Sequence, residues 1–180
     1  MNKVGHLRPD TSTLMVIDVQ ERLMPVIYEA ERVFANVNRM LAGAAILGVQ
    51  TLVTEQYPKG LGHTCAEVSL DGQPVLEKTC FSCFLNESIS SRIPAGNALV
   101  LCGVEAHICV LKTALDALHA GYEVHVLADA VSSRTPENHK IALDRLRQAG
   151  AFIASTEMVL FQWLDYAGND QFKAISKLIR

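Results

Sequence analysis

The hydrophobic pattern alternates along the chain between short, continuous apolar runs and longer stretches in which apolar residues recur at every third or fourth position. The short runs are typical of buried parallel strands, and the longer stretches are typical of amphipathic helices. The predicted strands are residues 14–19, 49–54, 74–78, 98–102, 122–128 and 152–155. The predicted helices are about residues 29–48, 87–92, 108–118, 137–149, 158–163 and 172–179.

This regular alternation of strand and helix predicts an α/β fold. Right-handed crossovers between successive strands build a parallel sheet that is covered on both faces. We therefore expect one domain over residues 1–180, a doubly wound, Rossmann-like fold with an about six-stranded, mostly parallel sheet and helices on both faces. Residues 55–73 show no periodicity and contain Pro58 and three glycines, which predicts a long loop of functional importance.

Composition narrows the class of protein further. The formal net charge is −3 and no basic block occurs, which argues against nucleic acid or an anionic membrane surface as the main partner. No apolar run reaches the length of a membrane span, and residues 1–10 lack the apolar core of a signal peptide, so we expect a cytoplasmic protein. Five cysteines, an odd number in a chain of this size, predict reduced thiols.

Three chemically matched residues follow predicted strands. Asp18 ends the first strand, Lys78 ends the third, and Cys109 falls at the start of the helix that follows the fourth. The carboxyl ends of parallel strands meet at one edge, so the three side chains are expected to converge. A helix start favours an anion, so a thiolate of Cys109 is expected to be more available than in water. Asp18 could instead cap the following segment, and Cys109 could be a buried core thiol.

The same residues carry a resemblance to a known family. V-I-D-V-Q at 16–20, E-K-T-x-F-S at 77–82 and G-V-x-x-x-x-C-V at 103–110 resemble, in this order, the signature segments of the isochorismatase-like cysteine hydrolases, which include nicotinamidases. The resemblance covers about residues 10–165. It implies that Asp18 is the general acid and base, Lys78 its electrostatic partner and Cys109 the nucleophile.

The resemblance also implies a backbone feature and a reaction. A cis peptide between Val104 and Glu105 would direct the amides of Glu105 and Cys109 at the oxyanion of a tetrahedral intermediate. The implied reaction is hydrolysis of a small amide-like (C–N) substrate through a thioester. Some relatives cleave a vinyl ether instead and lack the cysteine, so Cys109 favours C–N hydrolysis. Members of the family assemble, so a homo-oligomer, a dimer or larger, is expected.

One segment departs from the nicotinamidase pattern. Nicotinamidases carry an Asp-x-His metal segment after the second strand, where this chain has Thr54-Glu55-Gln56-Tyr57, and His63 is off the spacing. We therefore predict no catalytic metal and no cofactor. Residues 54–62 look like the isochorismatase-domain-containing subgroup, whose substrates are poorly defined.

Several further residues are candidates with open roles. The predicted pocket residues are Gln20, Leu23, Tyr57, Phe81, Phe84 and His107. The apolar and aromatic four could equally belong to the core, Gln20 could support the site by hydrogen bonding, and His107, beside Cys109, could contact the substrate. Cys80-x-x-Cys83 could be drawn as a zinc or redox site, although a single pair is weak evidence. We expect His125 to be structural and Asp129 to stabilise a turn over residues 129–136.

Two other functions remain alternatives at this point. A non-catalytic binding or scaffolding protein could retain the same fold. A nucleotide-binding Rossmann domain would need a G-x-G-x-x-G segment after the first strand, where this chain has V-I-D-V-Q-E. The prediction is a cofactor-independent cysteine hydrolase with a small-molecule substrate.

Overall fold

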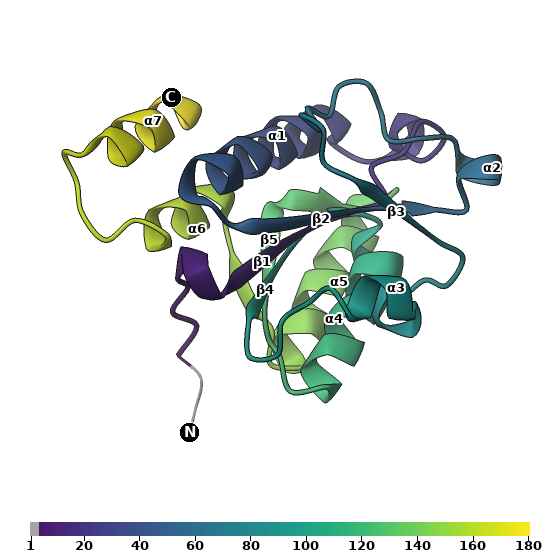
Figure 1. The fold of residues 1–180 in the computed structure, drawn as a ribbon. Coiled ribbons are helices and arrows are strands. Elements are labelled where there is room, and N and C mark those ends of the chain that lie inside the picture. Colours follow the sequence, from purple (N-terminus) through teal and green to yellow (C-terminus); the bar gives the residue numbers. More distant parts are fainter. Residues whose placement is uncertain (1–3) are drawn as a thin grey trace.

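A six-stranded sheet forms the centre of the molecule (Figure 1). The computed structural model describes residues 4–180. The strands are β1 (Ser12–Ile17), β2 (Gln50–Gln56), β3 (Val75–Lys78), β4 (Ala98–Val104), β5 (Glu123–Ser132) and β6 (Phe152–Ala154). They lie in the order β3-β2-β1-β4-β5-β6, and every neighbouring pair is parallel. The doubly wound α/β fold predicted from the hydrophobic pattern is therefore confirmed.

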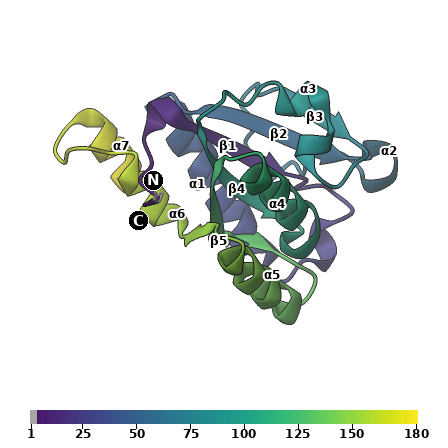
Figure 2. The same ribbon diagram turned by 90° about the horizontal axis from the view of Figure 1, so that it is seen from below.

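Helices cover both faces of the sheet. The helices α1 (Ala30–Leu47), α6 (Thr156–Gln162) and α7 (Asp170–Leu178) pack on one face. The helices α3 (Glu87–Ser90), α4 (Leu111–His119) and α5 (Pro136–Gln148) cover the other face, and Figure 2 shows α4 and α5 side by side there. A short helix α2 (Pro58–Leu61) lies outside both layers. Among residues 4–180, no helix is long and apolar enough to cross a membrane.

The two apolar layers explain the continuous hydrophobic runs. Every residue of β1 and of β4 is buried, because each strand has helices above and below it. Successive side chains of β1 alternate between the two layers: Leu14 and Val16 join the layer under α1, whereas Met15 and Ile17 join the layer under α4. A strand with one solvated face would have needed polar residues at alternate positions.

Two local predictions differ from the structure. Residues 129–136 do not form a turn throughout, because β5 continues to Ser132. Asp129 accepts hydrogen bonds from the amide (2.8 Å) and the hydroxyl (3.0 Å) of Thr156, so it anchors the start of α6 and does not stabilise a turn through Ser133. His125 is structural as expected, since it is buried and its ring stacks on Phe152 at 4.9 Å.

A glycine allows β1 and β4 to lie close together beside the candidate site. Gly103 pairs with Ile17 in the register of these strands and has φ of +105°. A Cβ atom at this position would collide with the backbone of Ile17. The register between β4 and β5 also shifts near Leu101 and Gly103, as in a β-bulge. Such irregularities are common next to active sites.

Candidate active site

Asp18 follows β1 at the carboxyl edge of the sheet. Its φ of +53° lies in the left-handed region, which residues other than glycine seldom adopt outside functional or strained positions. The backbone N–H of Asp18 donates to the carbonyl of Thr54 on β2 (3.1 Å), and the hydroxyl of Thr54 donates to Oδ1 of Asp18 (2.7 Å). The carboxylate is fully buried. A buried carboxylate needs a compensating charge as well as hydrogen bonds.

Lys78 supplies that charge from the end of β3. Its Nζ atom donates to Oδ2 of Asp18 (2.6 Å) and to Oε1 of Gln56 (2.8 Å), and it lies 3.4 Å from the carbonyl of Phe81. These contacts use the three N–H donors of an ammonium group. Burial opposes the charge on Lys78, but the negative charge of Asp18 and the thiols nearby outweigh it and raise the pKa of Lys78 above its usual value.

Cys109 lies in a π-helical turn (Ala106–Val110) that leads from β4 into α4. Its thiol lies close enough to Asp18 for the carboxylate to raise the pKa of Cys109, and the residue is 6% exposed. Burial and the negative charge of Asp18 raise the pKa of Cys109, and Lys78 offsets them only in part. The expectation of a more available thiolate is therefore wrong, because burial and the negative charge of Asp18 raise the pKa of the thiol more than Lys78 lowers it.

The structure thus brings together the three residues that the motifs singled out. Lys78 is paired with Asp18, the carboxylate of Asp18 acts on the pKa of Cys109, and the three side chains come from three different segments of the chain. A thiol near a buried, charge-paired carboxylate is an arrangement suited to proton transfer, because a carboxylate is able to accept a thiol proton.

The peptide bond between Val104 and Glu105 is cis. The carboxylate of Glu105 is buried and accepts a hydrogen bond from Nε of Arg134 (2.9 Å). Nδ1 of His107 lies 2.9 Å from the hydroxyl of Ser133 and 4.0 Å from the carboxylate of Glu105. The loop after β5 therefore holds the segment that precedes Cys109.

The predicted pocket residues have different surroundings. Tyr57 and Phe81 are each 53% exposed, and His107 is partly exposed. Phe84 is partly buried, and its ring packs edge-on against Tyr122 (5.4 Å between centroids) beside the apolar layer under α4. Leu23 likewise packs against the layer under α1.

Gln20 is hydrogen-bonded to the end of β2 and to the segment that follows it. It is fully buried, and its side-chain amide donates to the carbonyls of Gln56 (3.0 Å) and Gly62 (2.7 Å). Its Oε1 accepts from the backbone N–H of Gln56 (2.7 Å). Gln20 therefore holds the segment after β2 in place.

The other cysteines do not form a second centre. All five cysteines are free thiols, and Cys80 and Cys83 are not joined. Cys83 is buried, and its backbone N–H donates to the hydroxyl of Thr113 on α4 (3.1 Å). Burial raises the pKa of Cys83 to about 11. This thiol belongs to the packing beside the site.

The segment that matches the nicotinamidase metal site has other contacts here. One oxygen of the Glu55 carboxylate accepts from the amide (2.6 Å) and hydroxyl (2.8 Å) of Thr64, and the other lies 3.2 Å from Nδ1 of His63. Within residues 4–180, no group of three His, Cys, Asp or Glu side chains is arranged to hold a metal ion.

Sequence reasoning missed two polar residues of the site. Thr54 and Gln56 occupy alternate positions at the end of β2 and are both buried. The sequence did carry a signal for them. The polar run T-E-Q at 54–56 continues the two-residue period of a buried strand, which indicates polar side chains at its buried end.

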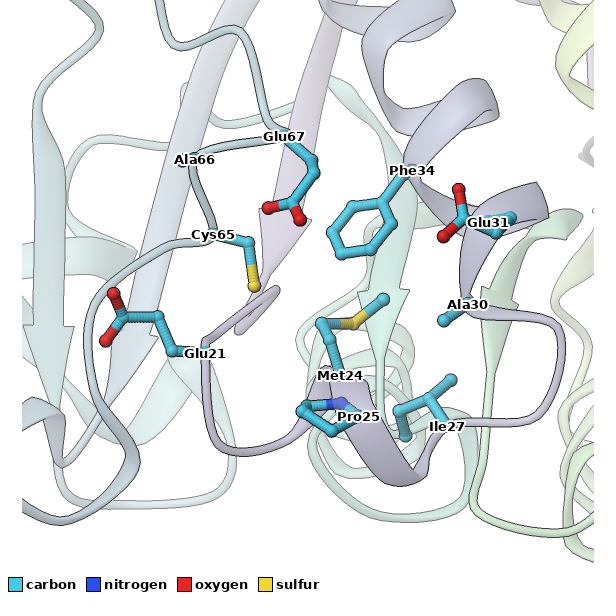
Figure 3. Close-up of a pocket in the computed structure, with 10 residues that line it drawn as sticks. All are labelled: Glu21, Met24, Pro25, Ile27, Ala30, Glu31, Phe34, Cys65, Ala66 and Glu67. Carbon is cyan, nitrogen blue, oxygen red and sulfur yellow. The ribbon is translucent and has the colours of Figure 1, made fainter.

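A cavity of about 490 Å³ opens between the start of α1 and the loop after β2. Figure 3 shows Met24, Phe34 and Cys65 facing one another, with carboxylates of glutamates around them. Asp18, Lys78 and Cys109 do not line this cavity. The chemistry predicted for the chain therefore lies outside it.

The isochorismatase domain is the family whose sequence model matches this chain, over residues 12–158. The chain belongs to the isochorismatase family. This isochorismatase-family chain is 42% identical over 186 residues to the secreted isochorismatase effector Isc1 of Phytophthora sojae, with 99% of this chain and 89% of that protein covered. It is 41% identical over 179 residues to isochorismatase domain-containing protein 2 of Homo sapiens, with 98% of this chain and 87% of that protein covered.

Solved structures similar to this chain have the same fold. The MAR1 ribonuclease of Caenorhabditis elegans superimposes with a TM-score of 0.87 at 35% identity, over 97% of this chain and 92% of that chain. The YcaC gene product of Escherichia coli, an octameric hydrolase of unknown specificity, superimposes with a TM-score of 0.91 at 22% identity, over 99% and 91%. The expected membership of the isochorismatase-like family and its fold are therefore confirmed.

Proposed function

We propose that the protein is a cysteine-dependent hydrolase of a small amide-like substrate and works through a thioester on Cys109. The observation that carries this proposal is the buried ion pair of Asp18 and Lys78 (2.6 Å), which lies near enough to the Cys109 thiol to shift its pKa. A carboxylate shared by a fixed cation and a thiol accepts a proton from sulfur and returns it to a leaving group.

The first half of the reaction forms the thioester. Asp18 takes the thiol proton as the sulfur of Cys109 attacks the substrate carbonyl, and the carbonyl oxygen becomes an oxyanion. The amides of Glu105 and Cys109 are the proposed donors to that oxyanion. Asp18 then gives its proton to the nitrogen as the C–N bond breaks, and ammonia or an amine leaves.

The second half regenerates the enzyme. Asp18 removes a proton from a water molecule, whose oxygen attacks the thioester carbonyl. The C–S bond breaks, the sulfur regains a proton from Asp18, and a carboxylic acid leaves. Lys78 keeps a positive charge beside Asp18 through both halves and so stabilises each state in which the site holds negative charge.

The accessibility of the nucleophile favours a small substrate. Cys109 is only 6% exposed, so a large polymer does not reach the sulfur without a rearrangement. Tyr57 and Phe81 are exposed aromatic side chains near the carboxyl edge of the sheet, and we assign them to the entrance. The residues themselves supply the nucleophile, the proton carrier and the counter-charge, so the proposed reaction is metal-independent and needs no cofactor.

The assembly and the compartment remain parts of the proposal. The octameric YcaC neighbour supports a homo-oligomer. A cytoplasmic location follows from the sequence argument, although the similar Phytophthora sojae protein is named a secreted effector.

The experiment that tests this function compares the wild type with Cys109→Ala and Asp18→Asn. Each protein is incubated with a panel of small primary amides, and ammonia release and the acyl adduct on Cys109 are measured by mass spectrometry. We expect turnover and a trapped adduct in the wild type alone. A Cys109 that forms no adduct and resists iodoacetamide at every pH tested contradicts the proposal and favours a non-catalytic binding protein.

A further inference from the structure

A buried amide contacts the candidate site from the middle of the polar network. Gln56 is 8% exposed and lies opposite Lys78 in the parallel register of β2 and β3. Its Oε1 atom accepts a hydrogen bond from Nζ of Lys78 (2.8 Å), and its Nε2 atom donates to the carbonyl of Thr79 (2.8 Å). Both ends of the side-chain amide are therefore engaged.

These contacts fix the orientation of the amide. A flipped Gln56 would place its NH₂ group against the ammonium of Lys78 and its oxygen against a carbonyl, so only the observed orientation is satisfied. The backbone of Gln56 is held as well, because its N–H donates to Oε1 of Gln20 (2.7 Å) and its carbonyl accepts from the amide of Gln20 (3.0 Å). The acceptor presented to Lys78 is thus pre-positioned.

We infer that Gln56 is a positioning residue that holds the ammonium of Lys78 against Asp18 and thereby controls how readily Cys109 ionises. The inference rests on the proposed function. The third contact of Nζ, to the carbonyl of Phe81, is long at 3.4 Å, so Gln56 is the main neutral acceptor of this buried cation. It acts through Lys78 and has no direct part in the reaction.

The charges around the site determine in which direction the loss of Gln56 shifts the pKa of Cys109. The titratable groups that act on Lys78 are Asp18 from β1, Cys83 from the turn after β3 and Cys109 from the π-helical turn. Loss of the Gln56 acceptor disfavours the charged form of Lys78 and frees its side chain to move. Lys78 is the group that lowers the pKa of Cys109. A weaker positive charge therefore makes the thiol harder to ionise.

The experiment measures the pH dependence of iodoacetamide alkylation at Cys109 by mass spectrometry in Gln56→Met, whose side chain has similar length but no comparable acceptor. We expect the midpoint to rise by about one pH unit, which is about a tenfold slower alkylation at pH 8. A merely structural role predicts the reverse. Loosened packing would expose Cys109 and remove the burial that raises its pKa, so alkylation would become faster.

A second variant and a matched control complete the test. Gln56→Leu, which also lacks an acceptor, is expected to raise the midpoint as well, and it serves if Gln56→Met does not fold. Gln50→Met is the control: Gln50 lies on the same strand and makes two side-chain hydrogen bonds, to Thr13 (3.0 Å) and Arg92 (2.9 Å), at the opposite end. Its profile should equal that of the wild type.

The outcomes separate this inference from the proposed function. An unchanged or lowered midpoint in the folded Gln56 variants overturns the inference, even where Asp18→Asn alters the profile. A wild-type profile that Asp18→Asn leaves unchanged overturns the proposed function, and the inference about Gln56 fails with it.

Discussion

Nζ of Lys78 lies 2.6 Å from Oδ2 of Asp18, although the two residues are 60 positions apart in the chain and neither side chain is exposed. The strand order explains the contact. Lys78 ends β3 at the edge of the sheet, Asp18 follows β1, and the side chain of Lys78 passes Gln56 at the end of the intervening strand β2. Such a pair is stable only when both charges are present, because either charge alone would be buried without compensation.

Removal of the cation alone should therefore destabilise the fold. Lys78→Met is expected to lower the free energy of unfolding by about 3 kcal/mol, because it leaves the carboxylate of Asp18 buried and unpaired. Urea denaturation followed by circular dichroism measures the change. Lys112→Met, at an exposed position of α4, should change stability by less than about 0.5 kcal/mol.

A double variant checks the physical reason. Asp18→Asn combined with Lys78→Met carries no buried charge and should recover part of the stability that Lys78→Met loses. If the double variant is as unstable as the sum of the two single variants, the loss comes from packing and not from the unpaired charge.

Neutralising Asp18 should separate ionisation of the cysteine from catalysis. Burial is the main cause that raises the pKa of Cys109, and the negative charge of Asp18 is the next, so Asp18→Asn removes a raising cause. We expect the alkylation midpoint of Cys109 to fall by about one pH unit, which makes the thiol about tenfold more reactive at a given pH below the midpoint.

The same variant should nevertheless lose amide turnover, because an asparagine neither accepts the thiol proton nor protonates the leaving nitrogen. Rates of alkylation and of ammonia release, measured on one preparation, test both expectations. Asp170→Asn, whose side chain is fully exposed in α7, is the control. An Asp18→Asn protein with raised alkylation midpoint and full turnover contradicts the proposed proton transfer.

Much of the fold was predictable because each central strand is buried on both sides. The apolar runs that include Val16 and Val100 marked two of the strands, and Asp18 stood out as the one charge in its run. The position of Cys109 at a helix start was also visible. Its ionisation was not, because the pKa of the thiol depends on burial and on the distance to a carboxylate from another strand.

The unpredicted parts of the site depend on contacts between elements. The contact between Gln56 and Lys78 follows from the register of β2 against β3, which one sequence does not specify. Phe84 is an aromatic residue, a type that is common in pockets. Only the packing of the turn after β3 against Tyr122 shows that its ring lies beside the apolar layer under α4. The pair of Glu105 and Arg134 joins segments that follow different strands.

Gly103 should tolerate no side chain. Its φ of +105° is strained for other residues, and a Cβ atom would collide with the backbone of Ile17. Gly103→Ala is expected to lower the free energy of unfolding by about 3 kcal/mol, as the sum of backbone strain and overpacking. Gly96→Ala is the matched control, since Gly96 has φ of +88° with open space around its Cβ position and should show the strain alone, about 1 kcal/mol. Equal losses would show that the contact with β1 is unimportant.

The ion pair between Arg134 and Glu105 should matter for the rate of acylation. Arg134→Gln removes the hydrogen bond of 2.9 Å that holds the buried carboxylate of Glu105, so the amides of Glu105 and Cys109, the proposed oxyanion donors, lose support. We expect a fall of about tenfold in the rate of acylation of Cys109 by p-nitrophenyl acetate, measured as the nitrophenolate burst. Arg147→Gln is the control: Arg147 is an exposed residue of α5, and its substitution should leave the burst unchanged. A burst in Arg134→Gln at the wild-type rate contradicts this role.

The structural similarity to a protein named as a ribonuclease suggests a last, negative prediction. Binding of RNA depends on neutralising phosphates with lysine and arginine, whereas this chain has a net charge of −3 and its 16 basic residues form no block. Cys109, the proposed nucleophile, is also only 6% exposed. We expect single-stranded RNA to remain intact with the wild type over hours, as seen by denaturing gel electrophoresis, while a small amide is consumed.

RNA cleavage that Cys109→Ala abolishes would place the chemistry of this site on a phosphodiester and overturn the amide assignment. Cleavage that persists in Cys109→Ala and Asp18→Asn would point to a contaminating nuclease or to another surface of the molecule, and chromatography of the activity with the protein separates these two.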